Sequence, residues 1–320
     1  MLQVSRILFP TDFSSTSDSA LTPACHWARR LGAELHLLHV VEALRPELYA
    51  ASLALPDPAI IDARLHEKAQ EELETRCRLA RDRGAKATCE SIEGLSPAPA
   101  ILDYAESHDA DLIAMSTHGR RGLRRFLLGS VTEEVVQRSS APVLTLRGEN
   151  TVYDAVPHRI LVAVDLSQHS AAAIGHAKEL AALFHAELQL LHVLVRPPIP
   201  ISYDGMSAPN LLPDFSQLEK EAQTALEELY ERSAGPSGPM SLHVVEGLPV
   251  DEILRFARVN SSDIVVVASH GLTGVKHLLL GSVAERVVRQ SSTPVLTLKS
   301  FGKSLIVKEP VASKARAACG

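Results

Sequence analysis

The chain has few cysteines, no long apolar run and no excess of positive charge. Its four cysteines are Cys25, Cys77, Cys89 and Cys319. None of them forms a Cys-x-x-Cys pair, which argues against a redox motif or a zinc knuckle. No apolar run approaches the ~20 residues needed to cross a bilayer. A net charge of −6 and a pI near 6.2 argue against a dedicated nucleic-acid-binding protein.

The N-terminal sequence MLQVSRILFPTD lacks a signal-peptide pattern. We therefore expect a cytoplasmic protein whose cysteines remain free thiols under reducing conditions. The length of 320 residues favours two domains. With 46% hydrophobic and 22% charged residues, the composition is that of an ordinary globular protein.

The strongest internal signal is a repeat. Four segments of the first half recur in the second half in the same order, shifted by 153 residues (Arg6 to Arg159) early and by 152 (Ser139 to Ser291) late. They are RILFPTDFS and RILVAVDLS, GAELHLLHVV and HAELQLLHVL, EGLSPAPAILDYA and EGLPVDEILRFA, and SSAPVLTL and SSTPVLTL. Because the copies are colinear, we predict that the chain is a duplicated unit.

Hydrophobic periodicity predicts the same order of elements in each half. In the first half we expect strands at 6–11, 34–41, 86–92, 111–115 and 143–146, and helices at 14–31, 61–83, 98–107 and 131–137. This alternation favours an α/β fold made of two tandem flavodoxin-like (Rossmann-type) domains, each a five-stranded parallel sheet with helices on both faces. The predicted divisions are domain 1 at 1–147, a linker at 148–158, domain 2 at 159–299 and a tail at 300–320. Within the tail, residues 305–307 could add an edge strand, and we expect disorder elsewhere.

The predicted strand ends indicate where a ligand would bind. In a flavodoxin-like sheet the ligand crevice lies beyond the carboxyl ends of the strands, at the point where the strand order reverses beside the first strand. Asp12, Val40 and the turn at 116–119 all lie at predicted strand ends. These residues are therefore expected to line one crevice.

The stretch 116–130 has a glycine pattern typical of a phosphate site. Nine residues separate Gly119 from Gly129, and Ser130 follows as the expected N-cap of the next helix. Glycine lets a backbone approach a ligand closely, and a helix N-terminus offers unpaired N–H groups to phosphate. The alternative is that the glycines only shape a strand–loop–helix turn.

The second half repeats this pattern in a weaker form. Gly271 and Gly281 are again nine residues apart, and Ser282 follows. Ala284, however, stands where the first half has Thr132. The second site therefore lacks one hydroxyl group that could contact phosphate.

Aspartates follow the first strand of both halves. Asp12 and Asp165 could accept hydrogen bonds from an adenine amino group or a ribose hydroxyl, or they could cap the next helix. A phospho-accepting aspartate is disfavoured, because the third strands end in Glu-Gly and not in the additional aspartate of a receiver domain.

The glycine span of the first half is rich in cations. It contains Arg120, Arg121, Arg124 and Arg125. These arginines could bind phosphate through charge-assisted hydrogen bonds or could be solvated surface residues. His118 and its counterpart His270 could contact the loop or a ligand, and no metal-ligand spacing accompanies them. Neither a Ser-His-Asp or Cys-His pattern nor a Walker lysine is present, which weakens the case for fast catalysis.

With these residues, the chain resembles a tandem member of the universal stress protein family over residues 4–299. The resemblance is carried by ILFPTDFS, LLHVV, MSTHGRRGLRRFLLGSVTEEVV and SSAPVLTL and by their second-half counterparts. It implies pairing of the two domains through their last strands, homodimerisation, and ATP, with or without Mg²⁺, as the ligand. It implies adenine near Asp12 and Val40, ribose near Met115 and Gly119, and phosphates at 129–132.

The candidate nucleotide-binding residues are Pro10, Thr11, Asp12, Val40, Met115, His118, Gly119, Arg120, Gly129, Ser130, Val131 and Thr132 in the first half, and Asp165, Val193, Gly271, Gly281, Ser282 and Val283 in the second. Two residues depart from the family signature, since Ser116 and Ala268 replace its first glycine. We expect a non-enzymatic ATP-binding stress regulator or sensor whose first site is the better supported. A slow ATPase or phosphotransfer enzyme and a nucleotide-free interaction scaffold are the alternatives.

Overall fold

The computed structural model describes residues 1–43, 58–117, 128–147, 156–195, 215–269, 280–299 and 302–306. The first half contains β1 (Arg6–Pro10), α1 (Ser15–Leu31), β2 (Glu34–Glu42), α3 (Pro58–Asp82), β3 (Lys86–Gly94), α4 (Pro97–Ser107), β4 (Leu112–Ser116), α5 (Ser130–Arg138) and β5 (Val143–Leu146). The second half contains β6 (Arg159–Val164), α6 (Gln168–Phe184), β7 (Glu187–Leu194), α7 (Phe215–Arg232), β8 (Met240–Glu246), α8 (Pro249–Val259), β9 (Ile264–Ala268), α9 (Ser282–Gln290) and β10 (Val295–Leu298). The order of elements predicted from periodicity is confirmed.

Local sequence explains where α1 begins and ends. The Ser14 side chain caps the helix by accepting a hydrogen bond from the Ser17 N–H. Gly32 ends it in the left-handed conformation, with φ 68°, and its N–H donates to carbonyl groups of the last turn. The following strand, β2, can therefore start two residues later and return beside β1.

The strands form one sheet in the order β3-β2-β1-β4-β5-β10-β9-β6-β7-β8. Neighbouring strands are parallel within each half, as expected for a flavodoxin-like, Rossmann-type fold. The order reverses between β1 and β4 in the first half and between β6 and β9 in the second. Each reversal creates a switch point of the kind that the sequence predicted.

The two halves join through their last strands. β5 and β10 pair antiparallel, with Thr145 opposite Val295 and Leu144 opposite Leu296. The Thr145 hydroxyl also donates to the carbonyl oxygen of Val295 at 3.2 Å. The pairing of the two units through these strands, expected from the family resemblance, is confirmed.

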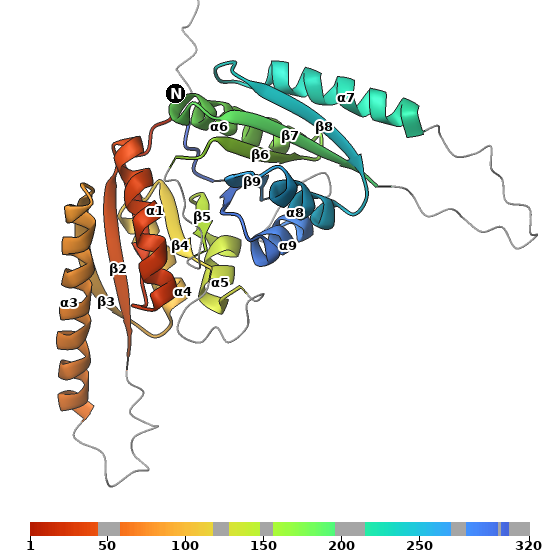
Figure 1. The fold of residues 1–320 in the computed structure, drawn as a ribbon. Coiled ribbons are helices and arrows are strands. Elements are labelled where there is room, and N and C mark those ends of the chain that lie inside the picture. The colour runs from red at the N-terminus through yellow and green to blue at the C-terminus, as the bar shows by residue number, and fades with distance from the viewer. Residues whose placement is uncertain are drawn as a thin grey trace, which may run out of the picture.

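Helices cover both faces of this sheet (Figure 1). One core contains side chains of α1, α3, α6 and α7, and it includes Trp27 of α1 beside Phe184 of α6, with ring centroids 5.1 Å apart. The other core contains side chains of α4, α5, α8 and α9. Alternate residues of β4 belong to opposite cores, since Ala114 faces the first and Met115 the second.

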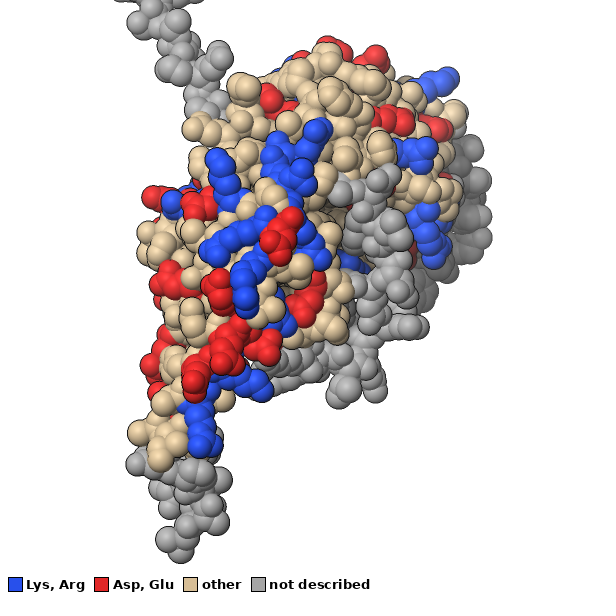
Figure 2. All heavy atoms as spheres, turned by 60° about the vertical axis from the view of Figure 1, so that its left-hand side comes forward, with Lys and Arg blue, Asp and Glu red and all other residues tan. Residues whose placement is uncertain are grey.

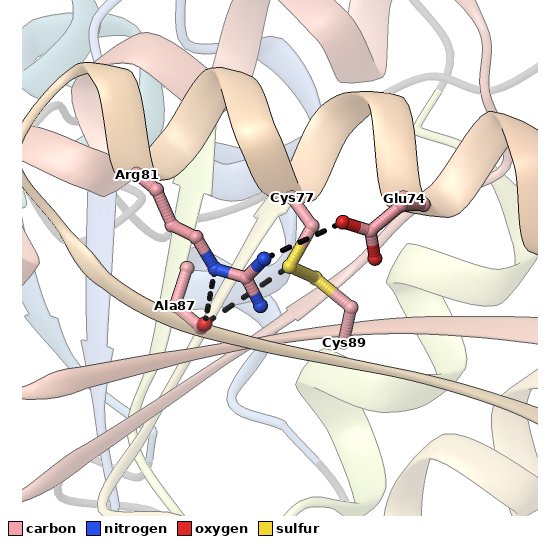
Figure 3. Close-up of a disulfide and its surroundings, with 5 residues drawn as sticks. All are labelled: Glu74, Cys77, Arg81, Ala87 and Cys89. Carbon is pink, nitrogen blue, oxygen red and sulfur yellow. Dashed lines mark hydrogen bonds and ion pairs between the residues drawn. A yellow bond between two sulfur atoms is a disulfide. The ribbon is translucent and has the colours of Figure 1, made fainter.

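A disulfide bond joins Cys77 of α3 to Cys89 of β3, with their Cα atoms 6.1 Å apart (Figure 3). The expectation of free thiols is therefore wrong for this pair. Its cause lies in the fold, because α3 packs on β3 and brings together residues on either side of the intervening turn. The adjacent Arg81 donates to the carbonyl oxygen of Ala87 at 3.1 Å and so strengthens the same contact. Cys25 is a buried free thiol, and burial raises its pKa to about 11.

Residues 302–306 form an ordered segment, here named the tail strap, so the disorder expected at 302–304 is wrong. A Cβ atom at Gly302 would collide with the carbonyl oxygen of Ser140, so only glycine fits this approach. Leu305 is buried, and its N–H donates to Nε2 of His176 at 3.2 Å. Its carbonyl oxygen accepts from the N–H of Gln3 at 2.8 Å. The expected edge strand is reduced to a single antiparallel bridge between Leu2 and Ile306.

The outer surface carries charges of both signs. On the face shown in Figure 2, Lys and Arg side chains are interspersed with Asp and Glu. Within the described parts of the chain, no helix is long and apolar enough to cross a bilayer.

Candidate functional site

The segment that follows β1 is a tight turn held by its own side chains. Oδ1 of Asp12 accepts from the N–H of Ser14 at 3.1 Å and from its hydroxyl at 2.6 Å. Oγ1 of Thr11 accepts from the N–H of Phe13 at 3.1 Å and from the hydroxyl of Ser17 at 2.9 Å. Ser14, and not Asp12, is therefore the N-cap of α1, while Asp12 fixes the position of that cap.

Two residues that the sequence interpretation did not assign to the site support this turn. The ring of His39 stacks on that of Phe13, with centroids 4.0 Å apart. Because Nδ1 of His39 lies 2.7 Å from the carbonyl oxygen of Thr11, that nitrogen carries the proton. The guanidinium carbon of Arg76 lies over the Phe13 ring, 4.6 Å from its centroid. The positive φ of Phe13, 63°, gave no sequence signal.

The next strands carry Val40 and Met115. Val40 is half-buried on β2, next to Gly94 at the end of β3. Met115 is only 4% exposed, because its side chain points into the core beneath α4 and α5. At this position a ligand in the crevice would meet main-chain atoms of β4 and not the thioether.

The helix α5 begins directly beyond the end of β4. The N–H of Gly129 donates to the carbonyl oxygen of Thr117 at 2.8 Å, and Glu133 N–H donates to Gly129 O at 2.8 Å. Gly129 is therefore the N-cap, with φ −64°, and the expectation that Ser130 is the cap is wrong. In the part of the chain that the structure describes, no side chain caps this helix. Its first N–H groups are thus oriented toward the strand-end side.

Thr132 and Ser130 differ in what their hydroxyl groups can reach. Thr132 is buried, and its hydroxyl donates to the carbonyl oxygen of Ser116 at 2.9 Å. The Thr132 side chain thus ties α5 to β4. Ser130 is exposed, as the first residue of the helix. Its hydroxyl and the main-chain N–H groups of the first turn are the groups best placed to meet an anion.

The second half repeats this geometry. Gly281 caps α9 with φ −58°, and its N–H donates to Ser269 O at 2.7 Å. Oδ1 of Asp165 accepts from the N–H of Ser167 at 3.1 Å and from the hydroxyl of Ser170 at 2.5 Å. His192 lies 2.8 Å from the carbonyl oxygen of Val164, as His39 lies beside that of Thr11.

The structure accounts for most of the candidate residues as strand-end or helix-start residues. Those at strand ends and in the turns after β1 and β6 are Pro10, Thr11, Asp12, Val40, Met115, Asp165 and Val193. Those at helix starts are Gly129, Ser130, Val131, Thr132, Gly281, Ser282 and Val283. His118, Gly119, Arg120 and Gly271 lie outside the described residues. The described residues contain no group of three or more His, Cys, Asp or Glu side chains that could hold a metal ion.

These observations define a class: a tandem α/β protein in which each half has a Rossmann-type switch point and a helix that starts there. The model of the Universal stress protein family matches residues 3–147 and again residues 157–299. The chain therefore belongs to the universal stress protein family, as a member with two copies of the unit.

Relatives of known sequence and structure agree with this placement. The chain is 36% identical over 145 residues to Universal stress protein MJ0531 of Methanocaldococcus jannaschii, covering 44% of this chain and 81% of that protein. It is 27% identical over 303 residues to a universal stress protein of Mycolicibacterium smegmatis, covering 92% and 96% of the two chains. A crystal structure of a universal stress protein from Archaeoglobus fulgidus superposes with a TM-score of 0.67 at 25% identity, covering 93% of this chain and 99% of that one.

Proposed function

We propose that this universal stress protein binds an adenine nucleotide, ATP in the first instance, in the crevice of its first half, and acts as a regulator or sensor. The observation that carries the proposal is the start of α5. Gly129 caps this helix without a side-chain cap, and an exposed Ser130 follows it at the end of the crevice. A helix N-terminus combines unpaired N–H groups with a partial positive charge and so favours phosphate.

The surrounding residues fit the remainder of a nucleotide. β1, β2 and β4 are neighbouring strands, so the groups at their carboxyl ends share one edge of the sheet. Asp12 supplies a carboxylate there, and Val40 a half-buried apolar side chain. We assign adenine and ribose to this side, with the phosphates against 129–132. Thr132 contributes its main chain, since its hydroxyl is bonded to Ser116.

In this proposal the role of the chain is binding. A bound ATP would supply a transferable phosphoryl group and a signal of the energy state, and Mg²⁺ could accompany it. The protein residues position the phosphates by main-chain N–H groups and the base by Asp12 and Val40. The second half has an equivalent helix start at Gly281, but the buried Ala284 replaces Thr132 and removes the hydroxyl tie between helix and strand. We therefore propose that the first site is the stronger.

The test is calorimetric titration of the full chain with ATP, using two variants and a matched control. Gly129→Val keeps an allowed φ of −64° but places a branched side chain against the phosphates. We expect an affinity at least ten times lower, which corresponds to about 1.4 kcal/mol. Ser130→Ala retains every main-chain N–H and should lose only a few-fold. Gly281→Val makes the same change at the second helix and should leave the first site intact.

A second pair of variants tests Asp12. Asp12→Asn preserves an oxygen that can accept from Ser14, whereas Asp12→Ala removes it. We expect Asp12→Ala to weaken ATP binding more than Asp12→Asn. Wild-type affinity in both Gly129→Val and Asp12→Ala would reject the assigned site. A wild-type chain that binds no nucleotide would favour the interaction scaffold.

A further inference from the structure

Arg289 of α9 lies between the first turns of both helices that begin at the candidate phosphate sites. Its Nη2 atom is 2.7 Å from Oε1 of Glu133 on α5 and 2.9 Å from Oε1 of Glu285 on α9. The three side chains are 34%, 31% and 30% exposed, so they are partly withdrawn from water. One guanidinium therefore pairs with the first-turn carboxylate of both helices.

The position of these carboxylates matters for an anionic ligand. Glu133 and Glu285 each follow the first helical serine by three residues, which is about 4.5 Å along a helix axis at ~1.5 Å per residue. A negative charge in the first turn of a helix opposes the binding of phosphate at its N-terminus, and salt screens such charges only incompletely within about 8 Å. A paired cation removes most of this repulsion.

The chain supplies this cation once. The residue of α5 that corresponds to Arg289, 152 positions earlier, is Gln137, which carries no charge. Arg289 is also held by its main chain, because its carbonyl oxygen accepts from Nη2 of Arg147 at 3.0 Å. In the reverse direction, the ammonium of Lys299 donates to the carbonyl oxygen of Val136. These crossed contacts fix the ends of α5 and α9 across the β5–β10 junction.

We propose that Arg289 is a positioning residue shared by both sites: it holds and neutralises Glu133 and Glu285, and so sets the affinity of each half for the phosphate groups of a nucleotide. This inference rests on the proposed nucleotide-binding function. It assigns control of the first site to a residue of the second half, where a comparison of motifs within one repeat would not find it.

The experiment measures ATP affinity of Arg289→Gln, the substitution that copies Gln137, by calorimetry. Each site is observed separately in chains that carry Gly281→Val or Gly129→Val. We expect binding to be about three- to tenfold weaker at both sites. Arg138→Gln is the matched control, because Arg138 pairs with Glu134 of its own helix at the surface, with 46% and 37% of the side chains exposed. This control should bind like wild type.

Rescue separates charge from packing. Adding Glu133→Gln to Arg289→Gln should restore the first site alone, and adding Glu285→Gln should restore the second alone. If wild type binds ATP and Arg289→Gln binds it equally well, or if neither rescue restores affinity, the inference is overturned while the proposed function stands. If wild type binds no ATP at either site, the proposed function fails, and this inference fails with it.

Discussion

The two halves have the same strand topology, but the equivalent helices α3 and α7 are held in place by different interactions. In the first half, a disulfide bond between Cys77 and Cys89 ties α3 to β3. In the second half, the buried ammonium of Lys178 donates to the carbonyl oxygens of Tyr230 and Ser233, at 2.8 and 3.0 Å, where α7 ends. Cys25 occupies the corresponding position of α1, 153 residues earlier. The two halves therefore hold α3 and α7 by contacts with different neighbours: α3 is joined to the strand β3, and the end of α7 is bonded to the helix α6.

The turns that follow β1 and β6 differ in one residue and in the hydrogen bonds around it. In the first half the hydroxyl of Ser17 donates to Thr11 at 2.9 Å. In the second half valine replaces this threonine at position 164, and the hydroxyl of Ser170 donates to Asp165 at 2.5 Å instead. Both carboxylates nevertheless accept two hydrogen bonds from the start of the following helix, Asp12 from Ser14 and Asp165 from Ser167 and Ser170. The substitution therefore changes which serine hydroxyl holds the carboxylate.

The largest difference between the halves should appear when the disulfide is removed. We expect Cys77→Ala with Cys89→Ala to lower the free energy of unfolding of the first half by about 2–4 kcal/mol, because the open chain gains conformational freedom in the unfolded state. Urea unfolding followed by the fluorescence of Trp27, the single tryptophan, measures this change.

Reductant provides the control for the disulfide. It should destabilise wild type by a similar amount and leave the double variant unchanged, while α7 should keep its hydrogen-exchange protection in both. Thiol titration of unfolded, unreduced wild type that finds all four cysteines reactive would contradict the bond.

A smaller effect is expected when the hydrogen bonds of Lys178 to the end of α7 are removed. Lys178→Met should destabilise the second half by about 1–3 kcal/mol, because two carbonyl oxygens lose a buried donor. Faster hydrogen exchange at the end of α7 measures it. Arg29→Met is the control, since the exposed Arg29 donates to Arg83 O just after α3 and should contribute less than about 0.5 kcal/mol. Equal losses in the two variants would remove the distinction drawn between the halves.

A pH-dependent effect is expected at the junction, where Arg147 and Lys299 each donate to a carbonyl oxygen of the helix in the other half. Burial lowers the pKa of Lys299 to about 8 from its ordinary 10.5. Between these values the unfolded chain binds more protons than the folded one, so the contribution of this group to stability rises with pH, by at most about 3 kcal/mol. Lys299→Arg stays protonated, as Arg147 does, and should abolish that rise in urea titrations between pH 8 and 10.5. A rise that persists in Lys299→Arg would assign it to other groups.

Much of the fold could be predicted from the sequence, because the patterns that specify each strand and helix are local and occur in both halves. Apolar runs of β length alternate with helical periods, and Ser14 and Gly32 mark the ends of α1 as capping residues do. The switch point between β1 and β4 was predictable from the alternation of strands and helices. Asp12 and Gly129, which the motifs singled out, lie just after β1 and just before α5.

The remaining features depend on contacts that no local pattern records. Cys77 and Cys89 meet only because α3 folds back onto β3. The serine after Gly129 is a favoured capping type, yet the hydrogen bond from Glu133 to Gly129 O starts the helix one residue earlier. Arg289 also gave no signal, since its two partners lie on different halves.

The tail strap brings the last described residues against the first ones. His176 accepts the Leu305 N–H through Nε2 while its Nδ1 lies 2.7 Å from Ala172 O, so the imidazole there is neutral, and burial keeps its pKa below the ordinary 6.5. A purification tag placed before Met1 would consequently sit beside this seam. Ending the chain at residue 299 would expose the core side chains that Leu305 covers and the Ser140 carbonyl group that Gly302 covers. Truncated and full-length preparations should therefore not be treated as interchangeable.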